Sequence, residues 1–159
     1  MKAIIFDVDG TLTDGKIYMG NDGEVMKRFD VKDGCGIHDL MPMHNLIPII
    51  ITARSSSIVA NRCKELGVTY YYQGCRDKIK KLDEIAEELH FCKDFAGIYQ
   101  EVAYMGDDII DLPVMKKCRF KGCPSDAVSE VREIADFISV NAGGNGAVRE
   151  FIEWIIKRI

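Results

Sequence analysis

Two aspartates near the start of the chain have the type and spacing that phosphoryl transfer needs. Asp7 and Asp9 follow a short apolar run, residues 2–6, and Gly10 and Thr11 come directly after them. A carboxylate can attack phosphorus and form an aspartyl-phosphate, and this is the role we expect of Asp7. Asp9 can then protonate the leaving alkoxide and later take a proton from the attacking water.

Three polar residues from distant parts of the sequence complete this chemistry: Thr52, Lys78 and Asp107. Carboxylates such as Asp7 and Asp107 repel each other in a crevice of low dielectric constant unless a cation lies between them. Mg²⁺ suits this place because it takes one or two carboxylates together with water and a phosphate oxygen. Lys78 would offset the phosphoryl charge. Thr52, with the N–H groups at the start of the helix expected after it, would bind phosphoryl oxygens.

The elements that must position these residues alternate along the chain. Apolar runs predict strands at residues 2–6, 47–51, 68–72, 102–105 and 137–140. Helical spacing predicts helices at residues 34–45, 55–66, 77–89, 112–117 and 147–158. Such alternation predicts an α/β fold, a parallel sheet with helices on both faces. Because ligands bind at the carboxyl ends of parallel strands, the polar residues that follow the strands should share one crevice.

A β-hairpin is expected between the first strand and the first helix. Two short extended segments, residues 17–19 and 25–29, flank Gly20-Asn21-Asp22-Gly23, which is a strong turn signal. The hairpin would form a flap of about residues 16–30 on a single domain of residues 1–159. We expect a loop with an irregular helical turn at residues 90–101.

Composition excludes several classes of protein. The chain has 159 residues, 47% of them hydrophobic, and a net charge of −4. A mildly acidic chain is a poor candidate for binding nucleic acid or a membrane surface, both of which favour a basic face. No apolar run is long enough for a transmembrane helix or a signal peptide. The six cysteines form no C-x-x-C pair, so we expect reduced thiols and a cytoplasmic location.

The residues to which we assign the phosphoryl-transfer chemistry, taken together, resemble the four motifs of the haloacid dehalogenase (HAD) superfamily of phosphohydrolases. Asp108 and Asp111 belong to the last of these motifs as supporting acidic residues. Longer segments resemble the 3-deoxy-D-manno-octulosonate 8-phosphate phosphatase family, which acts in lipopolysaccharide biosynthesis. These segments are residues 17–20, 29–37, 72–78, 102–115 and 143–150. The resemblance runs from about Ala3 to Glu150.

This resemblance implies a Rossmann-like core with the hairpin in place of a cap domain. It also implies a homotetramer whose hairpins help to close neighbouring sites. Mg²⁺ would be held by Asp7, Asp107 and the backbone carbonyl of Asp9, and the catalytic residues would be Asp7, Asp9, Thr52 and Lys78. The residues facing the sugar acid phosphate would be Asp9, Asp30, Val31, Lys32, Asp33, Gly34, Arg54, Arg62 and Lys78. Arg54 and Arg62 suit a substrate carboxylate because guanidinium groups bind carboxylates in a bidentate manner.

Other interpretations stay open. The same domain resembles phosphatases of nine-carbon sialic-type sugar acid 9-phosphates and the C-terminal domain of some acylneuraminate cytidylyltransferases, where it is a non-catalytic tetramerisation module. A phosphoacceptor receiver domain is disfavoured, because its lysine would follow all the acidic residues.

The sequence also departs from the family in three places. It reads Thr52-Ala53-Arg54 where the family often has Thr-Gly-Arg, and Asn145 where the family often has arginine. Some members carry a C-terminal tail that reaches a neighbouring site. Because the sequence ends at Ile159, we do not expect closure by such a tail.

Overall fold

The computed structural model describes all residues, 1–159, and is built around one six-stranded parallel sheet. The strand order across the sheet is β5-β4-β1-β6-β7-β8. The strands are β1 (Ala3–Phe6), β4 (Ile47–Ile51), β5 (Tyr70–Tyr72), β6 (Tyr99–Met105), β7 (Cys118–Cys123) and β8 (Phe137–Ile138). Every residue of β1 is buried, as expected of a central parallel strand covered on both faces.

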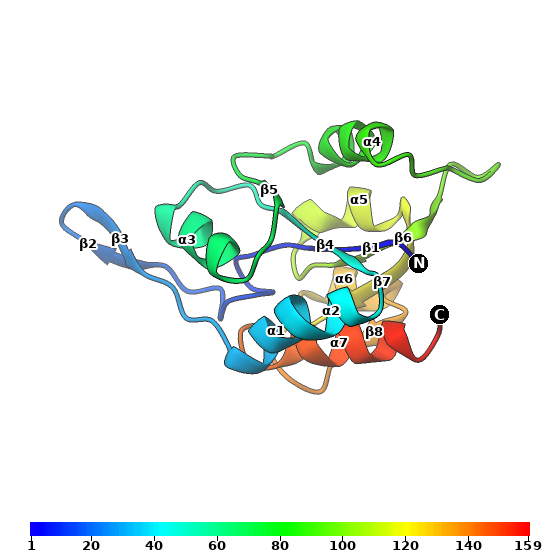
Figure 1. Cartoon of the computed structure of the whole chain (residues 1–159). Helices are drawn as coiled ribbons and strands as arrows, with labels where there is room; N and C mark the ends of the chain where they lie inside the picture. The colour runs from blue at the N-terminus through cyan, green and yellow to red at the C-terminus, as the bar shows by residue number, and fades with distance from the viewer.

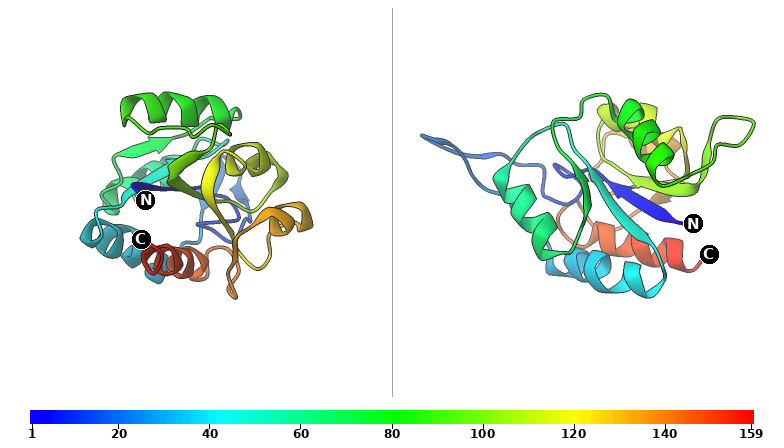
Figure 2. Two further views of the ribbon diagram at one scale, coloured as in Figure 1. Left: turned by 90° about the vertical axis from the view of Figure 1, so that its right-hand side faces the viewer. Right: turned by 45° about the horizontal axis from the view of Figure 1, so that its top comes forward.

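Helices cover both faces of the sheet, which confirms the predicted fold class (Figures 1 and 2). One face carries α1 (Val31–Cys35), α2 (Met41–Met43), α3 (Ser57–Glu65) and α7 (Ala147–Ile156), with a π-helical turn at Gly36–Leu40 between α1 and α2. The other face carries α4 (Lys78–Glu88), α5 (Leu112–Met115) and α6 (Ser129–Ile134). Alternate residues of β1 enter the two cores, Phe6 on the α7 side and Ile5 on the α4 side.

The strand order makes the carboxyl end of β1 a topological switch point of the sheet, the place where open α/β sheets form their ligand-binding crevice. This strand pairs with β4 on one side and with β6 on the other, so the connections diverge from it. Ligands bind at such a switch point in open α/β sheets. Asp7, Thr52 and Asp107, which follow these three strands closely, are therefore brought to one edge of the sheet.

The predicted hairpin is present, formed by β2 (Tyr18–Gly20) and β3 (Gly23–Met26) with Asn21-Asp22 at its turn. It projects from the body at the end of the molecule where β1 ends, on the left in Figure 1. Most of its side chains are exposed, and it is linked to the body at Thr13 and Phe29, which form an isolated antiparallel bridge.

Several predicted bounds are corrected by the structure. β7 and α6 were not predicted, because β7 carries charged residues between its buried ones and α6 is only six residues long. The first helical stretch begins at Val31 rather than residue 34, because the Asp30 side chain accepts a hydrogen bond from the Lys32 N–H and caps it. The strand predicted at residues 68–72 begins only at Tyr70, and the strand predicted at residues 102–105 begins already at Tyr99.

The segment of residues 90–101 contains no helical turn, so that expectation is wrong. The Asp94 carboxylate accepts hydrogen bonds from the backbone N–H groups of Ala96 and Ile98, both at 2.9 Å, and folds the chain into a turn. The chain then returns into β6. None of the helices is long and apolar enough to cross a membrane.

Candidate active site

Lys78 lies at the centre of the crevice and is almost fully buried. As the first residue of α4 it reaches across to β1, and its Nζ lies 2.6 Å from Asp7 Oδ1. The same Nζ lies 2.6 Å from Asp111 Oδ1 and 3.1 Å from the Tyr104 hydroxyl. Burial alone would lower the pKa of Lys78, but the charges of Asp7 and Asp111 outweigh it and raise the pKa. The ammonium therefore stays charged.

Tyr104 and Asp111 hold this lysine in place. The Tyr104 hydroxyl, fully buried on β6, donates to Asp111 Oδ1 at 2.7 Å. Asp111 Oδ2 accepts from the backbone N–H groups of Asp107 at 3.1 Å and Asp108 at 3.3 Å. Burial first, and then the charge of Asp111, raise the pKa of Tyr104, so it remains a hydrogen-bond donor.

Asp107 faces Asp7 from the end of β6. Its Oδ1 accepts a hydrogen bond from the Thr11 hydroxyl at 2.9 Å. The carboxylate lies directly against Gly10, where a Cβ atom would be 2.0 Å from Asp107 Oδ2 and where φ is +100°. Only glycine fits this position, since any side chain would both strain the backbone and displace the carboxylate.

Negative charge is concentrated where Asp7, Asp107 and Asp111 meet. Burial, and then repulsion by Asp111, raise the pKa of Asp7 to about 7 despite Lys78. Burial, and then repulsion by Asp7, raise the pKa of Asp107 to about 8. Carboxylate oxygens of Asp7, Asp107 and Asp111 lie within 4.8 Å of one another. A hard divalent cation between the Asp7 and Asp107 carboxylates would offset this repulsion, so these donors fit Mg²⁺.

Asp9 is held from two sides. The Lys27 ammonium, which comes from the end of the hairpin, contacts Asp9 Oδ1. Arg54 Nε lies 3.6 Å from Asp9 Oδ2. Glu24 joins this group, with one carboxylate oxygen 2.8 Å from Lys27 Nζ and 3.4 Å from Arg54 Nη2. Asp9 is thus connected both to the hairpin and to the loop after β4.

Thr52 is buried at the end of β4. Its hydroxyl accepts from the Arg54 N–H at 3.4 Å, and its backbone bonds to Tyr72 and Cys75. The helix predicted at residues 55–66 begins two residues later, at Ser57. A loop from Thr52 to Ser56 precedes the helix. Ser56 fixes this loop, since it donates its N–H to the side chain of Gln73 and its hydroxyl to Glu24.

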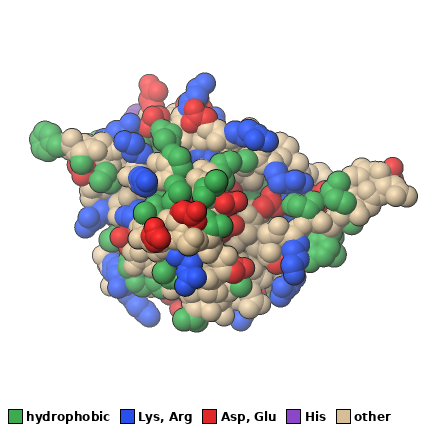
Figure 3. All heavy atoms as spheres, turned by 180° about the vertical axis from the view of Figure 1, so that it is seen from behind, with side chains coloured by type: hydrophobic (Ala, Val, Ile, Leu, Met, Phe, Trp, Pro, Cys, Tyr) green, Lys and Arg blue, Asp and Glu red, His purple; other side chains and the backbone are tan.

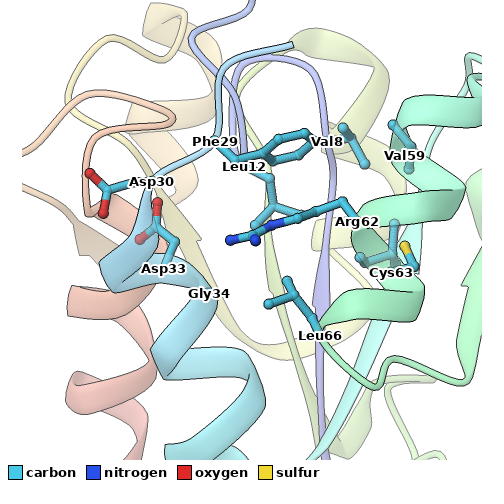
Figure 4. A pocket seen from close by; sticks show the side chains of 11 residues that line it. Val8, Leu12, Phe29, Asp30, Asp33, Gly34, Val59, Arg62, Cys63 and Leu66 are labelled. Atoms are coloured by element: carbon cyan, nitrogen blue, oxygen red, sulfur yellow. The ribbon is translucent and has the colours of Figure 1, made fainter. Parts of the chain in front are cut away.

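Arg62 extends from α3 towards α1, between Phe29 and Leu66 (Figure 4). Its guanidinium lies 5.6 Å from the centroid of the Phe29 ring, and its Nε is buried without a hydrogen-bond partner. The cavity around it has a volume of about 10 Å³ and is lined mainly by apolar side chains. A cavity of this volume can hold one water molecule but not a sugar acid.

The segment Asp30–Gly34 forms the opposite wall of that cavity, and its residues have different surroundings. Val31 and Lys32 are exposed, whereas Asp33 is only 1% exposed. The Asp33 carboxylate accepts from the N–H groups of Gly146 at 3.3 Å and Arg149 at 2.8 Å, at the start of α7. Its partners are therefore backbone groups of α7. Burial raises the pKa of Asp33 to about 6 despite these hydrogen bonds.

The structure thus divides the predicted residues into two groups. Asp7, Asp9, Lys78 and Asp107 meet at the end of β1, with Thr52 and Arg54 on the neighbouring loop. The residues around the small cavity beside Arg62 are Asp30, Asp33, Gly34 and Arg62 itself. Val8 and Leu12, on either side of Asp9 and Thr11, line that cavity too and connect the groups. Asp108 is exposed and its side chain caps the short 3₁₀ turn Ile109–Asp111.

Two residues in contact with this machinery were not predicted. Tyr104 is the one hydroxyl-bearing residue of an otherwise apolar stretch at the end of β6, which is a signal that sequence reasoning could have used. Lys27 follows a short exposed strand among other charged residues, and nothing in its pattern indicates burial.

Known proteins similar to this chain include phosphatases. No family model matches. The 3-deoxy-D-manno-octulosonate 8-phosphate phosphatase KdsC of Escherichia coli (strain K12) is 40% identical over 156 residues, covering 98% of this chain and 79% of that protein. The structure of the corresponding phosphatase from Moraxella catarrhalis, in complex with a magnesium ion, a phosphate ion and KDO, is similar with a TM-score of 0.89. It is 36% identical and covers 99% of this chain and 86% of that one. A HAD superfamily (subfamily III A) hydrolase from Legionella pneumophila gives a TM-score of 0.90 at 36% identity, covering 99% and 82%.

Proposed function

The chain belongs to the family of 3-deoxy-D-manno-octulosonate 8-phosphate phosphatases, and from this we propose that it hydrolyses the phosphate ester of that eight-carbon sugar acid. The observation that supports this most is the carboxylate pair at the switch point of the sheet, in which Asp7 is buried and bound by Lys78 and Asp107 is partly buried. Such a site binds a dianionic phosphoryl group once a cation is present. The reaction releases the free sugar acid and inorganic phosphate.

Mg²⁺ is the cofactor that we propose for this chain. Asp7 and Asp107 would hold it, with the backbone carbonyl of Asp9 as a third ligand. When bound, Mg²⁺ supplies positive charge to the carboxylates and to the phosphoryl oxygens.

The reaction would begin at Asp7. One carboxylate oxygen of Asp7 attacks phosphorus, the bond between phosphorus and the sugar oxygen breaks, and Asp9 donates a proton to that oxygen. A phosphoryl group is then attached to Asp7. Asp9, now ionised, takes a proton from a water molecule that attacks phosphorus and restores Asp7. Lys78 and Thr52 would hold the phosphoryl oxygens in both steps.

The sugar acid would lie across the loop after β4 and the wall of the small cavity beside Arg62. Arg54 is half exposed beside Asp9 and Glu24 and would turn from them towards a substrate carboxylate, and the buried Arg62 Nε lacks an acceptor. Asp9, Lys78 and the segment Asp30–Gly34 (Asp30, Val31, Lys32, Asp33 and Gly34) would complete the surface that faces the substrate.

A homotetramer is also part of this proposal. The hairpin of about residues 16–30 would act as a flap on a single domain, residues 1–159, and cover a neighbouring crevice. Hydrophobic side chains lie along the projecting hairpin, on the right in Figure 3. Met19 and Val25 are each 63% exposed and Met26 is 51% exposed. Burying such a patch against another subunit is favourable. A cytoplasmic location is consistent with six cysteines that are all free.

A substrate panel tests the proposal. Purified protein with Mg²⁺ is assayed with 3-deoxy-D-manno-octulosonate 8-phosphate, a nine-carbon sialic-type 9-phosphate and 4-nitrophenyl phosphate. We expect the highest kcat/KM for the eight-carbon ester and no turnover in excess chelator. Preference for the nine-carbon ester, or equal weak turnover of all three, would contradict the proposed substrate. No turnover of any ester would favour a non-catalytic module.

A further inference from the structure

Lys27 is a buried charge that the mechanism above does not use. It lies directly after β3, between the exposed residues Met26 and Arg28, yet its own side chain is 1% exposed. Lysine is rarely buried to this extent unless its ammonium is paired. Here the Nζ contacts Asp9 and lies 2.8 Å from Glu24. The hairpin therefore places the Lys27 ammonium in the crevice.

Lys27 is the closer of the two cations that hold the Asp9 carboxylate. Asp9 has two charged partners, and Arg54 is the weaker one, since it is 3.6 Å away and 47% exposed. Exposed pairs of this kind contribute little. Glu24 holds Lys27 in turn and accepts from the Ser56 hydroxyl at 2.5 Å, which ties the hairpin to the loop after β4. Lys27 is thus held in a defined position against Asp9 Oδ1.

We propose that Lys27 is a positioning residue for Asp9, and that it keeps this carboxyl group aligned with the oxygen of the leaving sugar. The inference rests on the phosphatase function and on the acid–base role proposed for Asp9. As the bond between phosphorus and the sugar oxygen breaks, the bonding electron pair goes to that oxygen, which receives the proton of Asp9. Lys27 keeps its own protons throughout, and its role in the proton transfer is to fix the geometry of Asp9.

The leaving group distinguishes this role from a structural one. An alkyl alkoxide needs a proton as it leaves, whereas 4-nitrophenolate is stable without one, so a displaced acid affects only the alkyl ester. General acids contribute about 10²–10⁴-fold, so loss of alignment should be large. For Lys27→Met we expect kcat/KM to fall at least tenfold for the sugar acid phosphate and less than threefold for 4-nitrophenyl phosphate. Lys116→Met, at an exposed lysine directly after α5 and outside the hairpin, is the matched control and should change neither.

A second variant shows whether Lys27 acts through Asp9. In an Asp9→Asn background the added Lys27→Met change should leave kcat/KM for the alkyl ester unaltered within about twofold, because a positioning residue has nothing left to position. Lys27→Arg keeps the charge but moves its centre, so it should show the same discrimination between esters on a smaller scale. Lys27→Arg carries the test if Lys27→Met does not fold.

Two results would overturn the proposal. One is an equal loss for both esters in a folded Lys27→Met protein. The other is the same loss from Lys27→Met with or without Asp9, which would make Lys27 a direct contact of the substrate. If the wild-type panel selects a different sugar phosphate, that alkyl ester replaces the eight-carbon one in the assay. Failure of the substrate proposal is in this way separate from failure of the Lys27 proposal.

Discussion

Asp111 illustrates how a carboxylate in an acidic cluster can serve as an anchor and not as a metal ligand. Its Oδ1 binds Lys78 and Tyr104, and its Oδ2 binds two backbone N–H groups of the loop after β6. With both oxygens occupied by protein donors, little capacity remains for an ion. Asp7 and Asp107, with fewer donors, are the better ligands. Asp111 instead fixes Lys78 and the loop that carries Asp107.

Lys78→Met tests the lysine in this arrangement. Removing the ammonium leaves Asp7 and Asp111 buried without their cation, and breaking a buried ion pair in this way costs about 3 kcal/mol or more. We expect a lower free energy of unfolding in denaturant titrations and at least a hundredfold lower kcat. The inhibition constant of inorganic phosphate should rise, because phosphate binds more weakly. An unchanged inhibition constant would show that Lys78 does not face the phosphoryl group.

Asp33 gives a prediction about pH. Its pKa of about 6 lies above its ordinary value, so the folded chain binds this proton more tightly than the unfolded chain does. Its contribution to stability is therefore present at low pH and is lost as the pH rises to about 6. Asp33→Asn removes this dependence. Relative to wild type, the free energy of unfolding of the variant should improve by about 2 kcal/mol between pH 4 and pH 7. Parallel pH profiles for the two proteins would contradict the assignment.

At the scale of elements, the sequence predicted the parts that rest on strong local patterns. The all-apolar strands β1 and β4, the striped helices α4 and α7 and the turn Asn21-Asp22 are where the patterns placed them. β7 and α6 were missed, because a strand interrupted by charges and a six-residue helix owe their structure to tertiary contacts: β7 pairs with β6, and α6 packs against β7 and the 3₁₀ turn Ile109–Asp111. Similarly, Asp33 reads as a polar residue of a loop, and only tertiary contact shows that it caps α7.

Gly34→Ala tests the contact between α1 and α3. A Cβ at this position would lie 2.4 Å from Arg62 Nη2 and 3.2 Å from Leu66, so the guanidinium must move, while alanine itself favours the helix. We expect stability to change by less than about 1 kcal/mol and KM for the sugar acid phosphate to rise several-fold. The KM for 4-nitrophenyl phosphate, which has no carboxylate, is the internal control. A similar rise for both esters would mean that Arg62 does not recognise the sugar acid.

At the scale of the whole molecule, the crevice has a sheet edge and loops around it but no cap. The hairpin projects away from the body instead of folding over it (Figure 1). The exposed apolar residues Met19, Val25 and Met26 lie on that projection. A surface of this kind is well suited to contact with another subunit. The tetramer would in this way supply the cover that each chain lacks.

Light scattering tests the assembly. Four copies of the 17.9 kDa chain are expected at micromolar concentration, and Val25→Lys on the hairpin should shift the mass towards smaller species by placing a charge in the interface. Lys116→Met serves again as the control and should keep the wild-type mass. A wild-type monomer would contradict the proposed tetramer without affecting the chemistry assigned to each crevice.

Chemical trapping of the phosphorylated residue tests the central claim most directly. Protein quenched in acid during turnover of the sugar acid phosphate is reduced with borohydride, digested and sequenced by mass spectrometry. Reduction converts an aspartyl-phosphate to homoserine, so the peptide that contains Asp7 should carry homoserine at that position, and the Asp7→Asn protein should show none. An unmodified Asp7 in an enzyme that is turning over, or homoserine at Asp9 or Asp107 in its place, would contradict the account.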